Sequence, residues 1–386
     1  MITREPELQF LIRNKDSEKI KILCGMRGSG KTLILAAYRR YLSDTGVPEA
    51  RIFHADLAAP AYRHLTAHEL YRKIYDAYPD GRPAYIFLDD ILRFDGCERL
   101  VDGLYRIANF DIYLTADGGP KSLAPLLATL PGRCLYRTVY PFSYAEIVGK
   151  PSLSAFLSYA ESASLPAAYE KEETSALDAA VSAAIYHEIM DDANIRKALL
   201  EKILTYLAPK TGDILDMKDL ARYAGRTGRP LLSKTLVSYL SALEAGGLLL
   251  IAPAVKLSDT ETKEKFPTRF RAFFPDTAMT GLFGEGVGAP YRKLLNTVAV
   301  ELWRRSDTVQ CAETEAGPVD FLTEKDSLRS LIQCIPRFDA PDAETKIRAL
   351  AAAPDSFKKI ILTLTPAPAE DALGIITEYL PAWMVR

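Results

Sequence analysis

Eight consecutive residues near the start of the chain place glycines, a lysine and a hydroxyl at the spacing of a phosphate-binding loop. Residues 25–32 read GMRGSGKT and follow the pattern G-x-x-x-x-G-K-[ST]. Glycines let the backbone N–H groups turn toward an anion, and the start of the following helix adds partial positive charge. Lys31 can then reach the β- and γ-phosphates, and the Thr32 hydroxyl can bind Mg²⁺. We therefore expect a nucleoside triphosphate to contact Gly25, Arg27, Gly28, Ser29, Gly30, Lys31 and Thr32.

Two acidic residues after an apolar segment predict the part of the same site that binds a metal ion. Residues 84–88 form a strand pattern that ends in Asp89 and Asp90. A strand of this kind delivers a carboxylate to Mg²⁺, so we expect Asp89 and Thr32 to hold the metal. Asp90 lies where a water-polarising glutamate usually stands in ATPases of the additional-strand class. Because aspartate is one methylene shorter than glutamate, we expect slow hydrolysis.

A polar residue also ends the strand pattern at residues 110–115. Thr115 is expected near the γ-phosphate, because ligands bind at the carboxyl ends of parallel strands. Its hydroxyl can report whether that phosphate is present, or it can be an ordinary polar strand end, and both interpretations stay open. The candidate catalytic residues are Lys31, Asp90 and Thr115.

Strand patterns alternate with helical stretches throughout the first part of the chain. This alternation is typical of an α/β fold with a parallel sheet covered by helices on both faces. The predicted strands are residues 20–24, 51–56, 84–90, 110–115 and 133–139.

These motifs resemble one family in their sequence and order. The likeness rests on residues 25–27 and 30–32, 86–90, 114–115, 132–133 and 140–146, the last of which follows Pro-[LF]-Ser-x-x-Glu. The chain resembles the bacterial and archaeal AAA-superfamily P-loop ATPases that carry a winged helix and a C-terminal restriction-endonuclease-like domain. The resemblance implies ATP and Mg²⁺ as cofactors and an AAA-like parallel sheet. The chain departs from that pattern at residues 115–117, where it reads TAD instead of TGS, and at Asp90.

Composition excludes strong global attraction to nucleic acid. The chain has 386 residues, and 48 basic against 50 acidic side chains leave a formal net charge of −2. Its five cysteines lack a C-x-x-C pair, so we expect buried free thiols in a reducing compartment. No apolar run approaches the roughly 18 residues of a membrane span. We expect a cytoplasmic protein without membrane contact.

After residue 150 the pattern changes to helices. A helical connector extends to about residue 209, and helices at 216–224 and 231–244 are followed by a strand at 248–252, the order of a winged helix-turn-helix. Residues 220–243 contain no acidic residue. Their basic residues are Arg222, Arg226, Arg229 and Lys234. Arg226, Arg229 and Lys234 can contact DNA phosphates. The same module can equally bind a protein partner, and both interpretations stay open.

The last part of the chain alternates between strands and helices and predicts a small mixed α/β domain. In the resembled family this region looks like a restriction-endonuclease core, where an acid on one strand and an acid-x-lysine on the next organise metal and water. Asp320 occupies the first acid position, but Gln333 and Ile335 stand where glutamate and lysine are expected. We therefore expect a nuclease-like domain that has lost its site, unless Glu301 or Glu313 completes it.

The sequence thus predicts three parts: a P-loop ATPase core at 1–150, a helical connector and winged helix at 151–265, and a degenerate nuclease-like domain at 266–386. The function expected is an ATP-dependent molecular switch. The alternatives are an interaction module that binds nucleotide without turnover and an ATP-dependent nuclease. A neighbouring subunit can supply an arginine finger, for which Arg133 is a candidate.

Overall fold

The chain folds as two compact units in a computed structural model that describes residues 2–171, 174–190, 195–225, 229–257, 266–284, 290–365 and 374–386. Unit 1 comprises Met1–Tyr140, Ala183–Glu188 and Ala245–Leu248. Unit 2 comprises Pro141–Ser182, Ile189–Glu244 and Leu249–Arg386.

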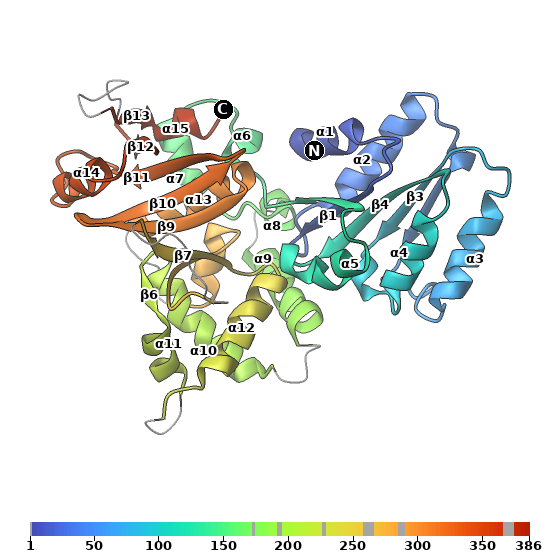
Figure 1. The fold of residues 1–386 in the computed structure, drawn as a ribbon, viewed down its shortest axis with the longest axis horizontal. Coiled ribbons are helices and arrows are strands. Elements are labelled where there is room, and N and C mark those ends of the chain that lie inside the picture. Colours follow the sequence, from blue (N-terminus) through green and yellow to red (C-terminus); the bar gives the residue numbers. More distant parts are fainter. Residues whose placement is uncertain are drawn as a thin grey trace. The chain divides into compact units, whose positions relative to one another are not determined.

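Unit 1 is built on a five-stranded parallel sheet with the order β2-β3-β4-β1-β5 (Figure 1). The strands are β1 (Ile20–Gly25), β2 (Ile52–Asp56), β3 (Ala84–Asp89), β4 (Phe110–Asp117) and β5 (Cys134–Thr138). The predicted parallel sheet is confirmed. β4 lies between β1 and β3, so the strand that carries the loop is not adjacent to the strand that carries the acid pair.

Helices cover both faces of this sheet because its strands are apolar on both sides. Successive side chains of a strand point to opposite faces, and Leu23 accordingly packs in a different cluster from Ile22. One face is covered by α1 (Glu5–Arg13) and α2 (Lys31–Asp44), and the other by α3 (Ala67–Ala77), α4 (Cys97–Tyr105) and α5 (Ala124–Thr129). Helices thus cover both faces of the sheet, and the carboxyl ends of its strands remain available to ligands.

Unit 2 contains one mixed eight-stranded sheet with the order β13-β12-β11-β10-β9-β7-β8-β6. Its strands are β6 (Leu215–Asp216), β7 (Leu250–Lys256), β8 (Arg269–Phe273), β9 (Thr308–Thr314), β10 (Gly317–Lys325), β11 (Leu328–Cys334), β12 (Lys358–Thr363) and β13 (Ile376–Tyr379). β7 pairs antiparallel with β8 and parallel with β9. The strand predicted as a wing therefore belongs to the same sheet as the C-terminal strands.

Helices precede and cover the sheet of unit 2. Leu294 and Val298 of α13 (Pro290–Arg305) pack in one cluster with Phe321, whereas Leu350 of α14 (Ala343–Ala351) packs in another with Leu322. Within the described residues, no helix has the length and apolar composition needed to cross a bilayer.

All five cysteines are free thiols, and four of them are buried. The other α-helices in the described residues are α6 (Tyr144–Ile147), α7 (Leu153–Glu161), α8 (Pro166–Lys171), α9 (Thr174–Ala184), α10 (Lys197–Leu207), α11 (Met217–Ala224), α12 (Ser233–Ala245) and α15 (Leu380–Trp383).

A buried ion pair joins the two central strands of unit 1. Lys21 of β1 is fully buried, and its ammonium pairs with Asp111 of β4. The same carboxylate accepts hydrogen bonds from the Tyr113 hydroxyl at 2.6 Å and from the Asp16 backbone N–H at 2.9 Å. Burial lowers the pKa of Lys21, and the charge of Asp111 opposes that shift. The pair is therefore stable only while both charges remain together.

We expect Asp111→Ala to lower the free energy of unfolding of unit 1 by about 3–5 kcal/mol, because the Lys21 ammonium would remain buried without its counter-ion. Urea denaturation of the full chain measures the change. Asp76→Ala is the matched control, since Asp76 pairs with Arg72 at 3.6 Å with both side chains more than half exposed. An equal effect of the two substitutions would contradict the importance of burial.

Candidate functional site

The predicted nucleotide-binding residues gather at the carboxyl edge of the sheet in unit 1. The phosphate-binding loop follows β1, the acid pair follows β3, and β4 ends at Asp117. Gly25 of β1 is the register partner of Asp117 on the neighbouring strand. Parallel pairing therefore places the loop and the acids at one edge, where open α/β sheets bind their ligands.

The loop has a backbone that only glycine permits at its first position. A Cβ atom on Gly25 would lie 2.2 Å from the carbonyl oxygen of Val139. Gly28 and Gly30 have φ angles of 82° and 95°, and Gly30 is the residue at which α2 begins to form. Ser29 is fully buried, and its carbonyl accepts a hydrogen bond from Arg4. The curled loop directly before a helix has the geometry that binds phosphate.

Lys31 is the most enclosed charged group of the loop. Its side chain is 5% exposed, and its ammonium donates to the carbonyls of Gly25 at 2.9 Å and Met26 at 3.0 Å. The third partner is the Asp117 carboxylate, at 2.6 Å. Thr32 follows in the first turn of α2 and is exposed. A nucleotide phosphate that binds Lys31 must therefore compete with Asp117.

The hydroxyl of Thr115 connects the two acids after β3. It donates to the Asp89 carboxylate and accepts a hydrogen bond from the Asp90 backbone N–H at 2.8 Å. Both acids are buried, with Asp89 at 5% exposure. The sequence predicted Thr115 in this site, and the structure shows that its hydroxyl holds both acids in place.

Asp90 has an unusual backbone and an unusual environment. Its φ angle of 57° lies in the left-handed region, which aspartate tolerates better than most residues. The buried Oδ1 atom has no hydrogen-bond partner among the described residues. Burial, and then the charge of Asp117, raises the pKa of Asp90 to about 7. A buried carboxylate oxygen without a partner is suited to bind a water molecule.

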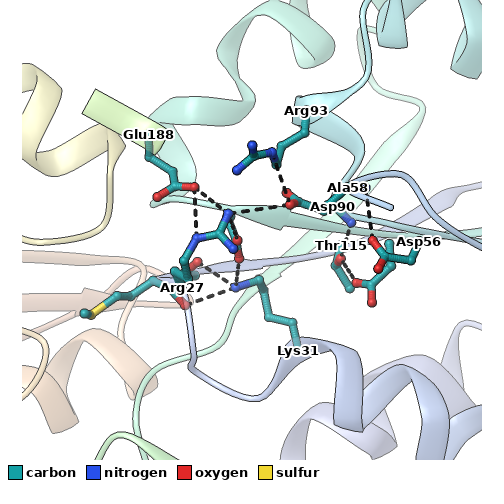
Figure 2. Close-up of polar contacts among 12 residues, drawn as sticks. Arg27, Lys31, Asp56, Ala58, Asp90, Arg93, Thr115 and Glu188 are labelled. Atoms are coloured by element: carbon teal, nitrogen blue, oxygen red, sulfur yellow. Dashed lines mark hydrogen bonds and ion pairs between the residues drawn. The ribbon is translucent and has the colours of Figure 1, made fainter. Parts of the chain in front are cut away.

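Arg27 contacts the predicted acid Asp90 and two further acids to which the sequence analysis assigned no role (Figure 2). Its guanidinium contacts Glu188 and Asp117, each at 2.7 Å, and Asp90 at 3.6 Å. Glu188 belongs to the π-helical turn η4 (Ile185–Ile189), and burial raises its pKa. The departure at residues 115–117 was a signal for Asp117, whereas no sequence pattern marked Glu188.

Arg133 lies at the opposite edge of the sheet. Its carbonyl accepts a hydrogen bond from the N–H of Ile20, the first residue of β1. Its guanidinium contacts Asp102 at 3.3 Å and lies over the ring of Tyr105. Arg133 therefore does not contribute to the site of its own chain.

The predicted nuclease acid lies in unit 2 within a buried hydrogen-bond network. The carboxylate of Asp320 accepts hydrogen bonds from the Arg271 guanidinium at 2.9 Å, the Tyr291 hydroxyl at 3.0 Å and the Cys334 N–H at 2.9 Å. Gln333 accepts a hydrogen bond from the Asp320 N–H at 3.0 Å. A guanidinium therefore takes the carboxylate that a metal would need.

The other residues considered for that nuclease site are also engaged elsewhere. Ile335 packs in an apolar cluster with Leu350. Glu301 pairs with Arg305 at 2.6 Å, and Glu313 pairs with Arg269. Across the described residues, no group of three histidine, cysteine or acidic side chains is arranged to hold a metal ion.

We expect the full chain to leave supercoiled plasmid intact in Mg²⁺ or Mn²⁺ with ATP, because Arg271 neutralises Asp320. We also expect Asp320→Ala to destabilise unit 2 by about 3–5 kcal/mol, since it leaves Arg271 buried without a counter-ion. Gel electrophoresis and urea denaturation measure the two effects. Plasmid cleavage that disappears in Asp320→Ala would contradict this interpretation.

Comparison with known proteins supports the P-loop assignment of unit 1. Residues 17–148 match the family model described as AAA domain. An uncharacterized protein of Haemophilus influenzae is 25% identical over 401 aligned positions, which cover all of this chain and 99% of that protein. The homology is therefore full-length.

Two solved structures resemble this chain in part. The Walker-type ATPase PABY2304 of Pyrococcus abyssi is 14% identical and covers 73% of this chain and 96% of its own, with a TM-score of 0.46. AMPPCP-bound DnaA of Aquifex aeolicus is also 14% identical and covers 61% of this chain and 85% of its own, with a TM-score of 0.29. Since both TM-scores are below 0.5, the assignment rests on the family model: residues 17–148 match an AAA domain, a P-loop ATPase domain.

Proposed function

We propose that unit 1 binds ATP with Mg²⁺ and hydrolyses it slowly, and that the chain acts as an ATP-dependent molecular switch. The observation that carries the proposal is the enclosure of the Lys31 ammonium by the loop carbonyls and Asp117, at the same sheet edge as Asp89 and Asp90. The match of residues 17–148 to an AAA domain supports ATP as the ligand.

The residues at this edge fit Mg²⁺ and a triphosphate. Mg²⁺ prefers oxygen ligands, and the exposed Thr32 hydroxyl and the Asp89 carboxylate supply them. When bound, Mg²⁺ neutralises charge on the phosphates. Lys31 exchanges Asp117 for phosphate oxygens, and the free Oδ1 of Asp90 orients the attacking water. Thr115 responds to the γ-phosphate through the two acids that it holds.

The alternative is a module that binds ATP without useful turnover. The short Asp90 side chain and its contact with Arg27 favour a low rate, because both restrict the position of the oriented water. In that case the order of the segments around the nucleotide carries the signal. Measurements of binding and of phosphate release distinguish the two functions.

We expect Lys31→Ala to weaken Mg²⁺-dependent ATP binding about 10–100-fold, because a charge-assisted hydrogen bond to phosphate is lost. We expect Asp90→Asn to keep binding and to lower hydrolysis about 100-fold or more, since a neutral amide polarises the water much less than a carboxylate does. Calorimetry measures binding, and single-turnover phosphate release measures hydrolysis.

Arg40→Ala is the matched control for these variants, because Arg40 lies on α2 with its side chain 85% exposed. Equal ATP affinity of the wild type and Lys31→Ala would remove the proposed function. A wild-type rate in Asp90→Asn would assign the water-orienting role to another group. Binding without phosphate release in the wild type would favour the non-hydrolysing module.

A second function, contact with DNA, is suggested by exposed cations in unit 2. α10, α11 and α12 are followed by the β7–β8 pair, which is the order of elements in a winged helix. α12 begins at Ser233, and Lys234 and Arg229 are exposed. Arg226 lies outside the described residues. The alternative partner for this surface is a protein.

If this surface binds duplex DNA, replacing Arg226, Arg229 and Lys234 by Ala should reduce the slope of log K against log salt by about 2 to 3, since each phosphate contact contributes about 0.9. Fluorescence anisotropy between low and moderate salt measures the slope. Lys197→Ala on α10 is a control with a side chain 69% exposed. Absence of binding to any duplex at low salt would favour the protein partner.

A further inference from the structure

The third residue of the phosphate-binding loop makes contacts that a loop scaffold does not need. Arg27 donates to Glu188 Oε1 from Nε at 3.2 Å and from Nη2 at 2.7 Å. Nη2 also lies 2.7 Å from Asp117 Oδ2. The side chain is 26% exposed, so solvent still reaches it. The guanidinium is therefore oriented by acids on two sides and remains accessible to a ligand.

Arg27 and Lys31 share one carboxylate. Asp117 pairs with Lys31 through Oδ1 at 2.6 Å and with Arg27 through Oδ2 at 2.7 Å. The two oxygens of the Asp117 carboxylate thus bridge the Lys31 ammonium and the Arg27 guanidinium. The γ-phosphoryl group also presents several anionic oxygens, and it binds ammonium and guanidinium groups in the same way. The carboxylate of Asp117 marks where these oxygens can lie.

The guanidinium also lies beside the acid that orients water. Arg27 Nη2 is 3.6 Å from Asp90 Oδ2. Figure 2 marks this contact with a dashed line. In phosphoryl transfer the γ-phosphorus lies between the P-loop lysine and the attacking water. Lys31 and Asp90 therefore limit where the transferred phosphoryl group can lie. Arg27 lies beside Asp90 and shares the Asp117 carboxylate with Lys31.

We propose, building on the ATPase function proposed above, that Arg27 contacts the γ-phosphoryl group from within its own loop and serves as an intrinsic arginine finger. In the reaction, the water oxygen forms a bond to the γ-phosphorus while the bond to the β–γ bridging oxygen breaks. The bridging oxygen leaves with ADP. One proton of the water stays on the attacking oxygen and the other passes to a phosphoryl oxygen, so both leave with the released phosphate. Arg27 stabilises the charge on the transferring oxygens and exchanges no proton.

Glu188 and Asp117 have different roles in this arrangement. Glu188 holds two nitrogens of the guanidinium and is a positioning residue. Asp117 occupies both cations and must move away from them when the triphosphate binds. A finger supplied by the same loop makes turnover a property of one chain, so the rate per chain is independent of protein concentration.

The test compares Arg27→Ala and Arg27→Lys in the full chain with the wild type and the Arg40→Ala control. We expect ADP affinity to stay within about threefold in Arg27→Ala, because ADP lacks the γ-phosphoryl group. We expect single-turnover hydrolysis to fall about 100-fold or more, and trapping of Mg²⁺–ADP–aluminium fluoride to be lost. Arg27→Lys should restore only part of both, since lysine lacks the planar fork of donors.

Several outcomes would overturn this assignment while leaving the proposed function intact. Arg27→Ala that hydrolyses ATP and traps aluminium fluoride like the wild type would overturn it. Equal loss of ADP and ATP binding in Arg27→Ala would also overturn it, because Arg27 would then only support the loop. A rate per chain that rises with protein concentration would place the finger on a neighbouring subunit. If the wild type does not hydrolyse ATP, aluminium fluoride trapping decides. Failure of the wild type to bind nucleotide would instead overturn the proposed function.

Discussion

The pairing of β1 with β4 is the constraint on which the site depends. It places Gly25, where the loop begins, directly beside Asp117. Because the loop then curls back over this edge, the Lys31 ammonium and the Arg27 guanidinium meet the same carboxylate. Charged groups this enclosed are stable only with opposite charges nearby. The arrangement of the loop is therefore set by the acids that pair with these two cations.

The sequence predicted the parts of this site that follow from local spacing. The loop motif and the apolar strands with polar ends were sufficient to bring Lys31, Asp89, Asp90 and Thr115 to one sheet edge. Sequence reasoning did not predict the role of Asp117, because β4 inserts between β1 and β3 and no local pattern reveals strand order. It also missed Glu188, which is 161 positions from its partner Arg27.

In unit 2 the sequence predicted a strand at β7 and an alternation of strands and helices after it, but not the short strands β6 and β13. β6 has two residues and β13 has four, too few for alternation to show. Gln333 and Ile335 stand against a nuclease site in the sequence, and the absence of nuclease activity stays a prediction. The partner of Asp320 was not predictable, since Arg271 lies on a strand 49 positions earlier. The buried pair gives Asp320 a structural role in unit 2.

The mixed sheet of unit 2 affects how the chain can be divided. Residue 265 looks like a boundary in the sequence, yet β7 before it pairs with β8 and β9 after it. A fragment that ends there would expose both edges of β7, and unpaired strand edges recruit strands from other molecules. Such a fragment would be prone to aggregate, so a gene truncated at this point is a poor source of an isolated winged helix. The two sequence modules therefore share one sheet and are expected to fold together.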